Sequence, residues 1–324
     1  MQTRLGIYPK TSLVFASLLV IVMLSVARGQ DPVETIRIDS DLVDLKVSVL
    51  GASASLAMPL LEQKDFVVFE DGKEQDIAFF AAADAPFDLV LLLDLSGSNS
   101  KKLKMIRSSA KRFIDSARPV DRIALVTFTD RPALYSSFTL DRKKLKKSID
   151  EMDEAIGGTS FWDSLNYVLT DMIGQRDRRS AIVVMTDGID NALPDVPGPG
   201  SDITFEALLH NIRNSESIIF PIYLNTEEEN VKHFHVPRAA YATAREQLSL
   251  IASSCGTTMY TANKLGDLDQ LYGQVIRDLS TVYSIGYRPA NRVHDGAWHA
   301  VTLQLLGHPE LEVRSKRGYY ETKE

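Results

Sequence analysis

Short apolar runs recur through the middle of the chain, and segments with helical periodicity lie between them. The runs are rich in leucine and β-branched residues and do not alternate with polar positions, which is typical of strands buried on both faces of a parallel sheet. The predicted strands are residues 87–93, 122–127, 181–185 and 218–224. The predicted helices are residues 104–117, 142–156, 162–173, 205–215 and 242–253. This order predicts an α/β fold, a doubly wound and mostly parallel sheet with right-handed crossovers.

The two ends of this α/β region show a different pattern, an alternation of apolar and polar positions with the period of a strand. The predicted flanking strands are residues 36–38, 43–49, 66–69 and 76–80 on one side and 283–287, 298–306 and 311–316 on the other. Each set is too small to bury its own apolar face, so we expect the two flanks to form one small β-sandwich, interrupted by the α/β domain. The expected domains are residues 30–86, 87–280 and 281–324.

The first 29 residues have the pattern of a secretory signal peptide. Arg4 and Lys10 precede an apolar stretch over residues 13–26, and Ala27 and Gly29 are the small residues expected before cleavage at Gln30. The stretch is shorter than the ~20 residues of a membrane-spanning helix. The sequence therefore predicts an exported protein, periplasmic, on the cell surface or secreted, without a transmembrane segment in the mature chain.

Composition limits the classes of partner. The 324-residue chain has 44% hydrophobic residues and a net charge of −7, which suits a globular protein and argues against nucleic acid as the main partner. The short basic runs are predicted to be solvated helix faces. Cys255 is the only cysteine, so it has no disulfide partner within the chain, and we expect it to be a buried, unreactive thiol.

Oxygen-bearing side chains follow the predicted strands. Asp94, Ser96 and Ser98 come directly after the first apolar run, Thr159 opens a loop before a helix, and Asp187 follows a later strand. Carboxylates and hydroxyls are ligands for Mg²⁺, Mn²⁺ or Ca²⁺, whereas zinc or copper would call for His or Cys. We expect the hydroxyls to bind the ion directly and the two carboxylates to act through waters. A site rich in neutral hydroxyls leaves the cation under-neutralised, so it should attract one more carboxylate from a partner.

The Asp-x-Ser-x-Ser loop, the later Thr and the final Asp resemble the metal-ion-dependent adhesion site of von Willebrand factor type A domains. Asp94, Ser96, Ser98, Thr159 and Asp187 each match a position of that motif, and the resemblance covers about residues 87–280. It implies a metal-dependent protein-binding module of no catalytic activity, with partner contacts from the loops around Asn99, Ser160 and Gly188. The flanks at residues 65–72 and 315–320 resemble those of the Acidobacteria-type group of bacterial secreted proteins related to this family.

Alternatives remain at this stage. Ser98 or Ser100 is also a suitable N-cap for the following helix. A metal-assisted hydrolase would use the same ligands but lacks a candidate general base, and a structural module with an empty site is a third possibility. We expect His233 and His235, which follow the acidic run at residues 227–229, to lie in a surface loop rather than in a second metal site. Asp190 is predicted to accept hydrogen bonds from loop backbone donors.

Overall fold

The computed structural model describes residues 42–51, 59–97, 100–153, 157–174, 178–233, 236–290 and 294–321. All of them belong to one compact unit, Ile38–Glu324. The predicted signal peptide and the predicted strand at residues 36–38 lie outside the described residues, as do Ser98, Asn99 and His235.

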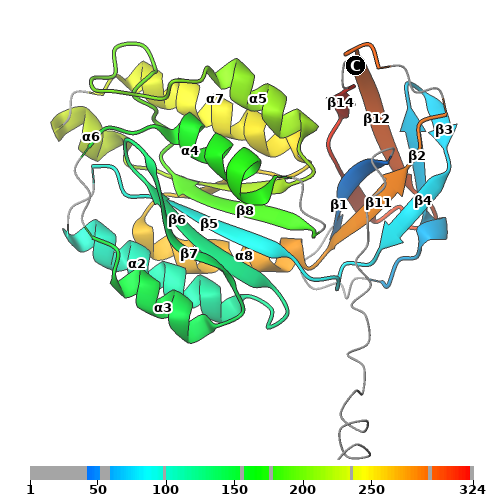
Figure 1. The fold of residues 1–324 in the computed structure, drawn as a ribbon, viewed down its shortest axis with the longest axis horizontal. Coiled ribbons are helices and arrows are strands. Elements are labelled where there is room, and N and C mark those ends of the chain that lie inside the picture. The colour runs from blue at the N-terminus through cyan, green and yellow to red at the C-terminus, as the bar shows by residue number, and fades with distance from the viewer. Residues whose placement is uncertain are drawn as a thin grey trace, which may run out of the picture. The chain divides into compact units, whose positions relative to one another are not determined.

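A six-stranded sheet with the order β10-β9-β8-β5-β6-β7 forms the centre of the α/β domain (Figure 1). All neighbouring strands pair in parallel except β6 and β7, which are antiparallel. The strands are β5 (Asp88–Asp94), β6 (Arg122–Phe128), β7 (Pro132–Thr139), β8 (Ser180–Thr186), β9 (Ile218–Leu224) and β10 (Tyr260–Ala262). Strands β5, β8 and β9 are buried along their whole length, which confirms the prediction from their continuous apolar runs.

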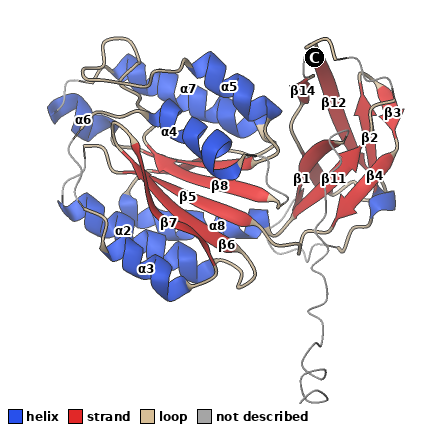
Figure 2. Ribbon diagram, in the orientation of Figure 1, coloured by secondary structure: helices blue, strands red, loops and turns tan. Residues whose placement is uncertain are grey.

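Helices cover both faces of this sheet, with α4, α5 and α7 on one face and α2, α3 and α8 on the other (Figures 1 and 2). The helical elements are α2 (Ser100–Ser116), α3 (Arg142–Asp150), α4 (Phe161–Tyr167), the π-helical η2 (Val168–Ile173), α5 (Phe205–Asn214), α6 (Glu227–His233), α7 (Arg238–Ser254), the 3-10 turn η3 (Leu265–Asp267) and α8 (Leu268–Leu279). Side-chain caps fix two of the starts. Asp141 accepts from the backbone of Lys143 and Lys144 at α3, and Thr204 accepts from Ala207 at α5.

The flanks form two four-stranded sheets with the orders β13-β1-β11-β4 and β14-β12-β2-β3. Their elements are β1 (Val43–Gly51), the 3-10 turn η1 (Gln63–Asp65), β2 (Phe66–Glu70), β3 (Lys73–Gln75), β4 (Ile77–Ala81), β11 (Val282–Tyr287), β12 (Trp298–Leu305), β13 (Leu311–Arg314) and β14 (Gly318–Tyr320). Both sheets combine strands from before and after the α/β domain, which alternate in the first sheet and meet at the β12–β2 pair in the second. Strand β11 lies between β1 and β4, and β12 lies between β14 and β2. The two flanks therefore complete each other, as the alternation predicted.

One hydrophobic core joins these two sheets into a sandwich, separate from the core of the α/β domain. The rings of Phe66, Phe80 and Tyr283 lie 5.4–5.8 Å apart, centre to centre, so they link β2, β4 and β11. Aromatic groups at this spacing add stability beyond the area that they bury.

Two arginines connect the sandwich to the start of β5. Arg179 donates to the carbonyl oxygens of Ala82 and Ala85, both at 3.1 Å, and to that of Val282. Its guanidinium also lies 4.0 Å from the ring centre of Phe87. Arg118 donates to the carbonyls of Ala83 and Ala85. Burial lowers the pKa of Arg179 to about 10, which leaves it charged at neutral pH.

Some predicted elements differ from the structure. The helix predicted for residues 142–156 ends at Asp150. The prediction was too long because Met152, which is buried although it follows the helix, continues the apolar pattern. His233 was expected to lie in a surface loop and instead ends α6, a seven-residue helix with Val231 as its single apolar residue. Val231 packs against the core of the α/β domain, and ion pairs from Glu227 to Arg238 and Arg245 of α7 also hold the helix. The prediction of a loop was wrong because periodicity does not detect such a helix.

Candidate functional site

Two predicted site residues stand at the same edge of the central sheet. Asp94 ends β5 and Asp187 directly follows β8, and these strands are parallel neighbours paired from Asp88–Ser180 to Leu93–Met185. Ligand sites in open α/β sheets lie beyond the carboxyl ends of the strands, where these two carboxylates are found.

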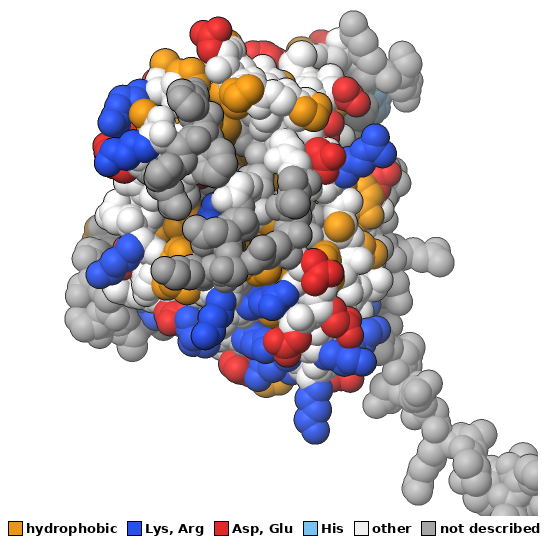
Figure 3. All heavy atoms as spheres, turned by 90° about the vertical axis from the view of Figure 1, so that its left-hand side faces the viewer, with side chains coloured by type: hydrophobic (Ala, Val, Ile, Leu, Met, Phe, Trp, Pro, Cys, Tyr) orange, Lys and Arg blue, Asp and Glu red, His pale blue; other side chains and the backbone are white. Residues whose placement is uncertain are grey.

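Figure 3 shows the side of the molecule on which α6 lies. Basic and acidic side chains are interspersed over its lower part, where Figure 1 places α2 and α3.

Three hydrogen bonds fix the carboxylate of Asp94. The backbone N–H and the hydroxyl of Ser96 donate to Oδ1 at 2.9 and 2.5 Å, and the hydroxyl of Thr186 donates to Oδ2 at 2.6 Å. Asp94 is only 4% exposed. Its carboxylate therefore organises the loop after β5 and joins it to the end of β8.

The carboxylate of Asp187 is held in a similar way by a third strand end. The Thr226 hydroxyl, just after β9, donates to Oδ2 at 2.5 Å, and the side-chain amide of Asn230 donates to the same oxygen at 3.2 Å. The backbone N–H of Ile189 donates to Oδ1 at 3.2 Å. Sequence reasoning missed Thr226 and Asn230. The available signal was Asn225-Thr226, polar residues that follow a third parallel strand.

Ser96, Thr159 and Asp187 line one pocket of about 190 Å³. The Thr159 loop is held against the next loop, since its N–H donates to Oδ1 of Asn191 at 2.8 Å. At Gly158 a Cβ atom would lie 2.6 Å from the carbonyl oxygen of Pro199, so glycine permits this close approach. The structure thus brings one residue from each of the three predicted segments to the same pocket.

The other predicted site residues have different positions. Ser98 and Asn99 lie outside the described residues. Ser160 and Gly188 are buried, and the N–H of Ser160 donates to the carbonyl of Thr129 at 2.8 Å. Gly188 has a φ of 74°, and a Cβ atom there would lie 2.9 Å from Leu248. These two residues shape the loops, whereas Gly97 is exposed at the rim of the pocket.

Asp190 accepts hydrogen bonds from loop donors, as predicted. The backbone N–H groups of Trp162, Ala192 and Ser201 donate to it at 2.9 Å, and the Ser201 hydroxyl donates at 2.6 Å. Asp190 is fully buried, and its oxygens are occupied by these donors. Its role is to connect the Asp187 loop to α4 and to the loop before α5.

The electrostatics of the pocket fit a cation. Burial is the main cause that raises the pKa of Asp94 to about 6, and the neighbouring charge of Asp187 adds to it. Lys102 and the hydroxyls of Ser96 and Thr186 act in the opposite direction without cancelling the increase. The buried charge of Asp94 is thus left under-neutralised, close to the carboxylate of Asp187 and to hydroxyl oxygens. This donor set, without His or Cys, suits a hard divalent ion.

The sequence model of the von Willebrand factor type A domain matches residues 88–274, more than half of the chain. The chain belongs to this family. The von Willebrand factor type A (VWA) domain therefore accounts for the central sheet and its helices, while the sandwich lies outside the matched residues.

Several known proteins are similar to the chain. A UPF0353 protein of Mycolicibacterium paratuberculosis is 22% identical over 222 residues, which are 65% of this chain and 64% of that protein. Proximal thread matrix protein 1 from the mussel byssus, in a structure with a zinc-occupied MIDAS motif, is 18% identical with a TM-score of 0.48, over 65% of this chain and 49% of that one. The von Willebrand factor domain of the pilus tip protein Mfa5 from Porphyromonas gingivalis is 16% identical with a TM-score of 0.44, over 65% of this chain and 99% of that one. The chain thus spans less than two thirds of the first two proteins.

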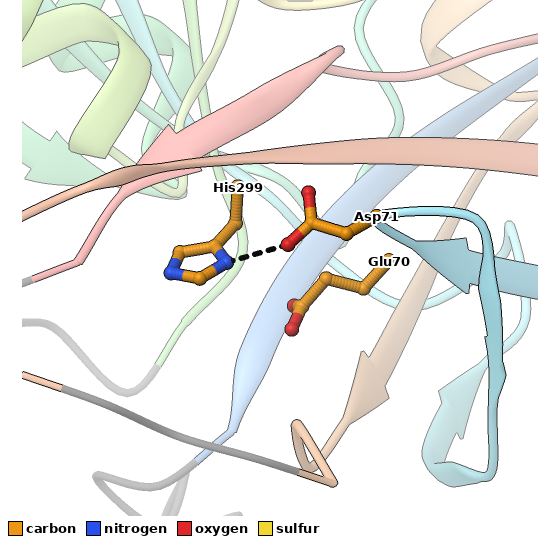
Figure 4. A group of neighbouring side chains, drawn as sticks. All are labelled: Glu70, Asp71 and His299. Atoms are coloured by element: carbon orange, nitrogen blue, oxygen red, sulfur yellow. Dashed lines mark hydrogen bonds and ion pairs between the residues drawn. The ribbon is translucent and has the colours of Figure 1, made fainter.

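A second polar cluster lies in the sandwich and was not predicted. Glu70, Asp71 and His299 have ligand-type atoms within 4.8 Å of one another (Figure 4). His299 Nδ1 lies 2.8 Å from Oδ2 of Asp71, and the hydroxyls of Tyr287 and Tyr319 donate to Oε2 of Glu70 at 2.5 and 3.0 Å. Because these groups have hydrogen-bond partners within the sandwich, we assign the cluster to the packing of β2, β11, β12 and β14.

Two remaining predictions concern Cys255 and the two histidines at residues 233 and 235. Cys255 is buried, which confirms that part of the prediction, and burial raises the pKa of its thiol to about 12, so the reactive thiolate is disfavoured at neutral pH. His233 and His235 are the pair considered for a second metal site. His233 ends α6, while its side chain and the whole of His235 lie outside the description.

Proposed function

We propose that the chain is an exported, divalent-metal-dependent protein-binding module. Its VWA domain would bind an Asp or Glu side chain of a partner protein through a metal ion, with Mg²⁺ preferred and Mn²⁺ or Ca²⁺ as alternatives. The observation that carries this proposal is the pocket shared by Ser96, Thr159 and Asp187, backed by the buried carboxylate of Asp94. We propose the domain boundaries 87–280 for the VWA domain, with flanks 30–86 and 281–324.

Each residue has a proposed role. Ser96, Ser98 and Thr159 would bind the ion through hydroxyl oxygens, while Asp94 and Asp187 would hold its waters and balance its charge. When bound, the ion supplies the positive charge that attracts a partner carboxylate. The hydrogen bonds from Thr186 and Ser96 keep the Asp94 carboxylate in one orientation, so it is preorganised for this role.

We propose binding rather than catalysis for this pocket. Among its described lining residues, Asp187 and Tyr241 carry titratable side chains, and burial raises the pKa of Tyr241 well above its ordinary value. Asp94, whose pKa is raised to about 6, is not one of these lining residues, and both of its oxygens already accept hydrogen bonds from Ser96 and Thr186. The described lining instead combines hydroxyls, glycines and apolar residues, a surface suited to holding a partner side chain.

Export is proposed from the first 29 residues of the sequence, which lie outside the described part of the chain. Among the described helices, none has the length and apolarity required to pass through a bilayer.

Calorimetric titration with Mg²⁺ tests the site. The purified chain should bind one ion, and Asp94→Ala or Ser96→Ala should abolish binding without loss of the fold. Glu206→Ala is a suitable control, because Glu206 is an exposed acid at the start of α5. If both site variants bind Mg²⁺ like the wild type, the site is misassigned.

A further inference from the structure

The carboxylate of Asp187 is almost saturated with hydrogen bonds before any cation is considered. A carboxylate has about four lone-pair positions, two on each oxygen. Thr226 and Asn230 fill both positions of Oδ2, and the N–H of Ile189 fills one position of Oδ1. One position, on Oδ1, is left for a metal ion or for a water bound to it.

Thr226 and Asn230 form a closed triangle with Asp187. The Asn230 amide also donates to the Thr226 hydroxyl at 3.0 Å, so each of the two residues supports the other. Thr226 is 8% exposed, whereas Asn230 is half-buried and lines the pocket. A buried hydroxyl and an amide at the pocket wall thus determine which oxygen of Asp187 is accessible.

Helix α6, which carries Asn230, is itself fixed in position. Glu227, at its first position, pairs with Arg245 at 2.9 Å and with Arg238 at 3.0 Å, both on α7. Arg245 also donates to the Tyr223 hydroxyl at 3.2 Å. Because α6 is tied to α7 and to the end of β9, Asn230 remains beside Asp187.

We infer that Thr226 and Asn230 are positioning residues that set the metal preference of the site, an inference that rests on the proposed metal-binding function. By occupying Oδ2 they prevent Asp187 from binding an ion through both oxygens. Ca²⁺ takes six to eight ligands and accepts carboxylates through both oxygens, whereas Mg²⁺ requires octahedral geometry and keeps several waters. A carboxylate limited to one oxygen therefore favours Mg²⁺ or Mn²⁺ over Ca²⁺.

The test compares Mg²⁺ and Ca²⁺ affinities of the full chain by calorimetry. In Asn230→Ala and Thr226→Val, Mg²⁺ affinity should fall by about ten-fold or more, as is common when a group that orients a ligand is lost. Ca²⁺ affinity should fall less or rise, so the ratio of the two dissociation constants shifts toward Ca²⁺. Thr226→Ser keeps the hydroxyl and should retain the wild-type ratio. Lys232→Ala is the matched control, because Lys232 is exposed on the same helix.

Folding is checked by thermal melting in chelator. Asn230→Ala changes a half-buried side chain and carries the test alone if Thr226→Val does not fold. A wild-type Ca²⁺ to Mg²⁺ ratio in Asn230→Ala would overturn the inference. Asp94→Ala, measured in parallel, separates the two failures. If Asp94→Ala still binds Mg²⁺, the metal site itself is wrong. If it loses Mg²⁺ while Asn230→Ala keeps the wild-type ratio, only the positioning role is wrong.

Discussion

The hydroxyl of Thr186, at the last position of β8, donates a 2.6 Å hydrogen bond to Oδ2 of Asp94, at the last position of β5. The same hydroxyl accepts from the N–H of Gly188 at 2.9 Å. Thr186 therefore connects the two acidic loops of the pocket. Asp94 keeps its negative charge inside the fold, where burial raises the pKa of the carboxyl to about 6 although the Thr186 hydrogen bond acts to lower it.

Asp94→Asn should stabilise the metal-free protein. A carboxyl pKa raised from 3.8 to about 6 means that ionised Asp94 destabilises the fold at neutral pH. At about 1.4 kcal/mol per pH unit, removing the charge should raise the free energy of unfolding by up to about 3 kcal/mol. The loss of the Thr186 donation to Oδ2, which an amide nitrogen cannot accept, should reduce this gain by about 1 kcal/mol. Saturating Mg²⁺ should raise the melting temperature of the wild type but not of the variant. Denaturant unfolding in chelator and in Mg²⁺ measures both effects.

Asp190→Asn provides a control of opposite sign. Asp190 is also fully buried, but three backbone N–H groups and a hydroxyl donate to it. An amide cannot accept all of these bonds, so this variant should lose about 1–3 kcal/mol. If Asp94→Asn destabilises the metal-free protein as much as Asp190→Asn, the Asp94 charge is not under-neutralised.

Much of the fold was predictable because strands buried on both faces of a sheet appear in the sequence as continuous apolar runs. The run that ends at Leu224 is a strand with the predicted bounds, and the flanking strands around Phe66 and Ile285 were also found. Strand β7 was missed because it is an antiparallel edge strand, with Pro132 at its start and Leu134 46% exposed. Strands β3, β10 and β14 have three residues each, too few to show a period.

The site was predictable only in part. Asp94, Ser96 and Thr159 stand out as oxygen-bearing residues around predicted strand and helix boundaries. The neighbours of Asp187 do not, because Thr226 and Asn230 are common surface residue types, and α6 gives no apolar pattern that would place Asn230 at the pocket. Their contribution depends on strand order, which brings β9 beside β8.

Arg179→Lys should destabilise the junction between the sandwich and β5. Arg179 donates to three carbonyl oxygens, and a lysine ammonium on a flexible stem does not reproduce that planar set of donors. With about 1.5–3 kcal/mol for a hydrogen bond to a charged group, we expect a loss of roughly 2–4 kcal/mol in denaturant unfolding. Arg131→Lys, at an exposed position, should change stability by less than about 0.5 kcal/mol. Equal effects of the two substitutions would contradict the role of Arg179.

The His299–Asp71 pair should make the stability of the sandwich depend on pH. Its hydrogen bond to Asp71 raises the pKa of His299, and the same bond lowers the pKa of Asp71. The raised His299 pKa gives a stabilisation that is fully present below the unfolded pKa of about 6.5. This stabilisation is lost as pH rises through the folded pKa. The lowered Asp71 pKa gives a stabilisation that is fully present above the unfolded pKa of about 3.9. This stabilisation is lost as pH falls through the folded pKa.

The pair should therefore contribute most between about pH 4 and 6.5, by roughly 0.2–1 kcal/mol because Asp71 is half exposed. Melting curves from pH 5 to 8 measure the loss on the alkaline side, and His299→Gln should remove that part of the slope. Glu70 and Asp295 also act on His299, so Asp71→Asn should leave a reduced slope rather than none. An unchanged slope in His299→Gln would exclude the pair as its source.

Thr159→Ala should abolish metal-dependent partner binding although it adds no bulk to the pocket. Thr159 is the proposed hydroxyl ligand on the loop opposite Ser96, and both line the pocket together with Asp187. A partner captured in Mg²⁺ should be released by chelator, rebind with Mg²⁺ or Mn²⁺, and bind Thr159→Ser but not Thr159→Ala. Lys146→Ala, on α3, where Lys146 pairs with Asp115 of α2 and does not line the pocket, should bind like the wild type. Removing one acidic side chain of the partner should cost as much as removing the metal, since both changes leave the same contact unmade. If calorimetry shows Mg²⁺ bound to the wild type and Thr159→Ala still captures the partner as Lys146→Ala does, the metal does not mediate binding.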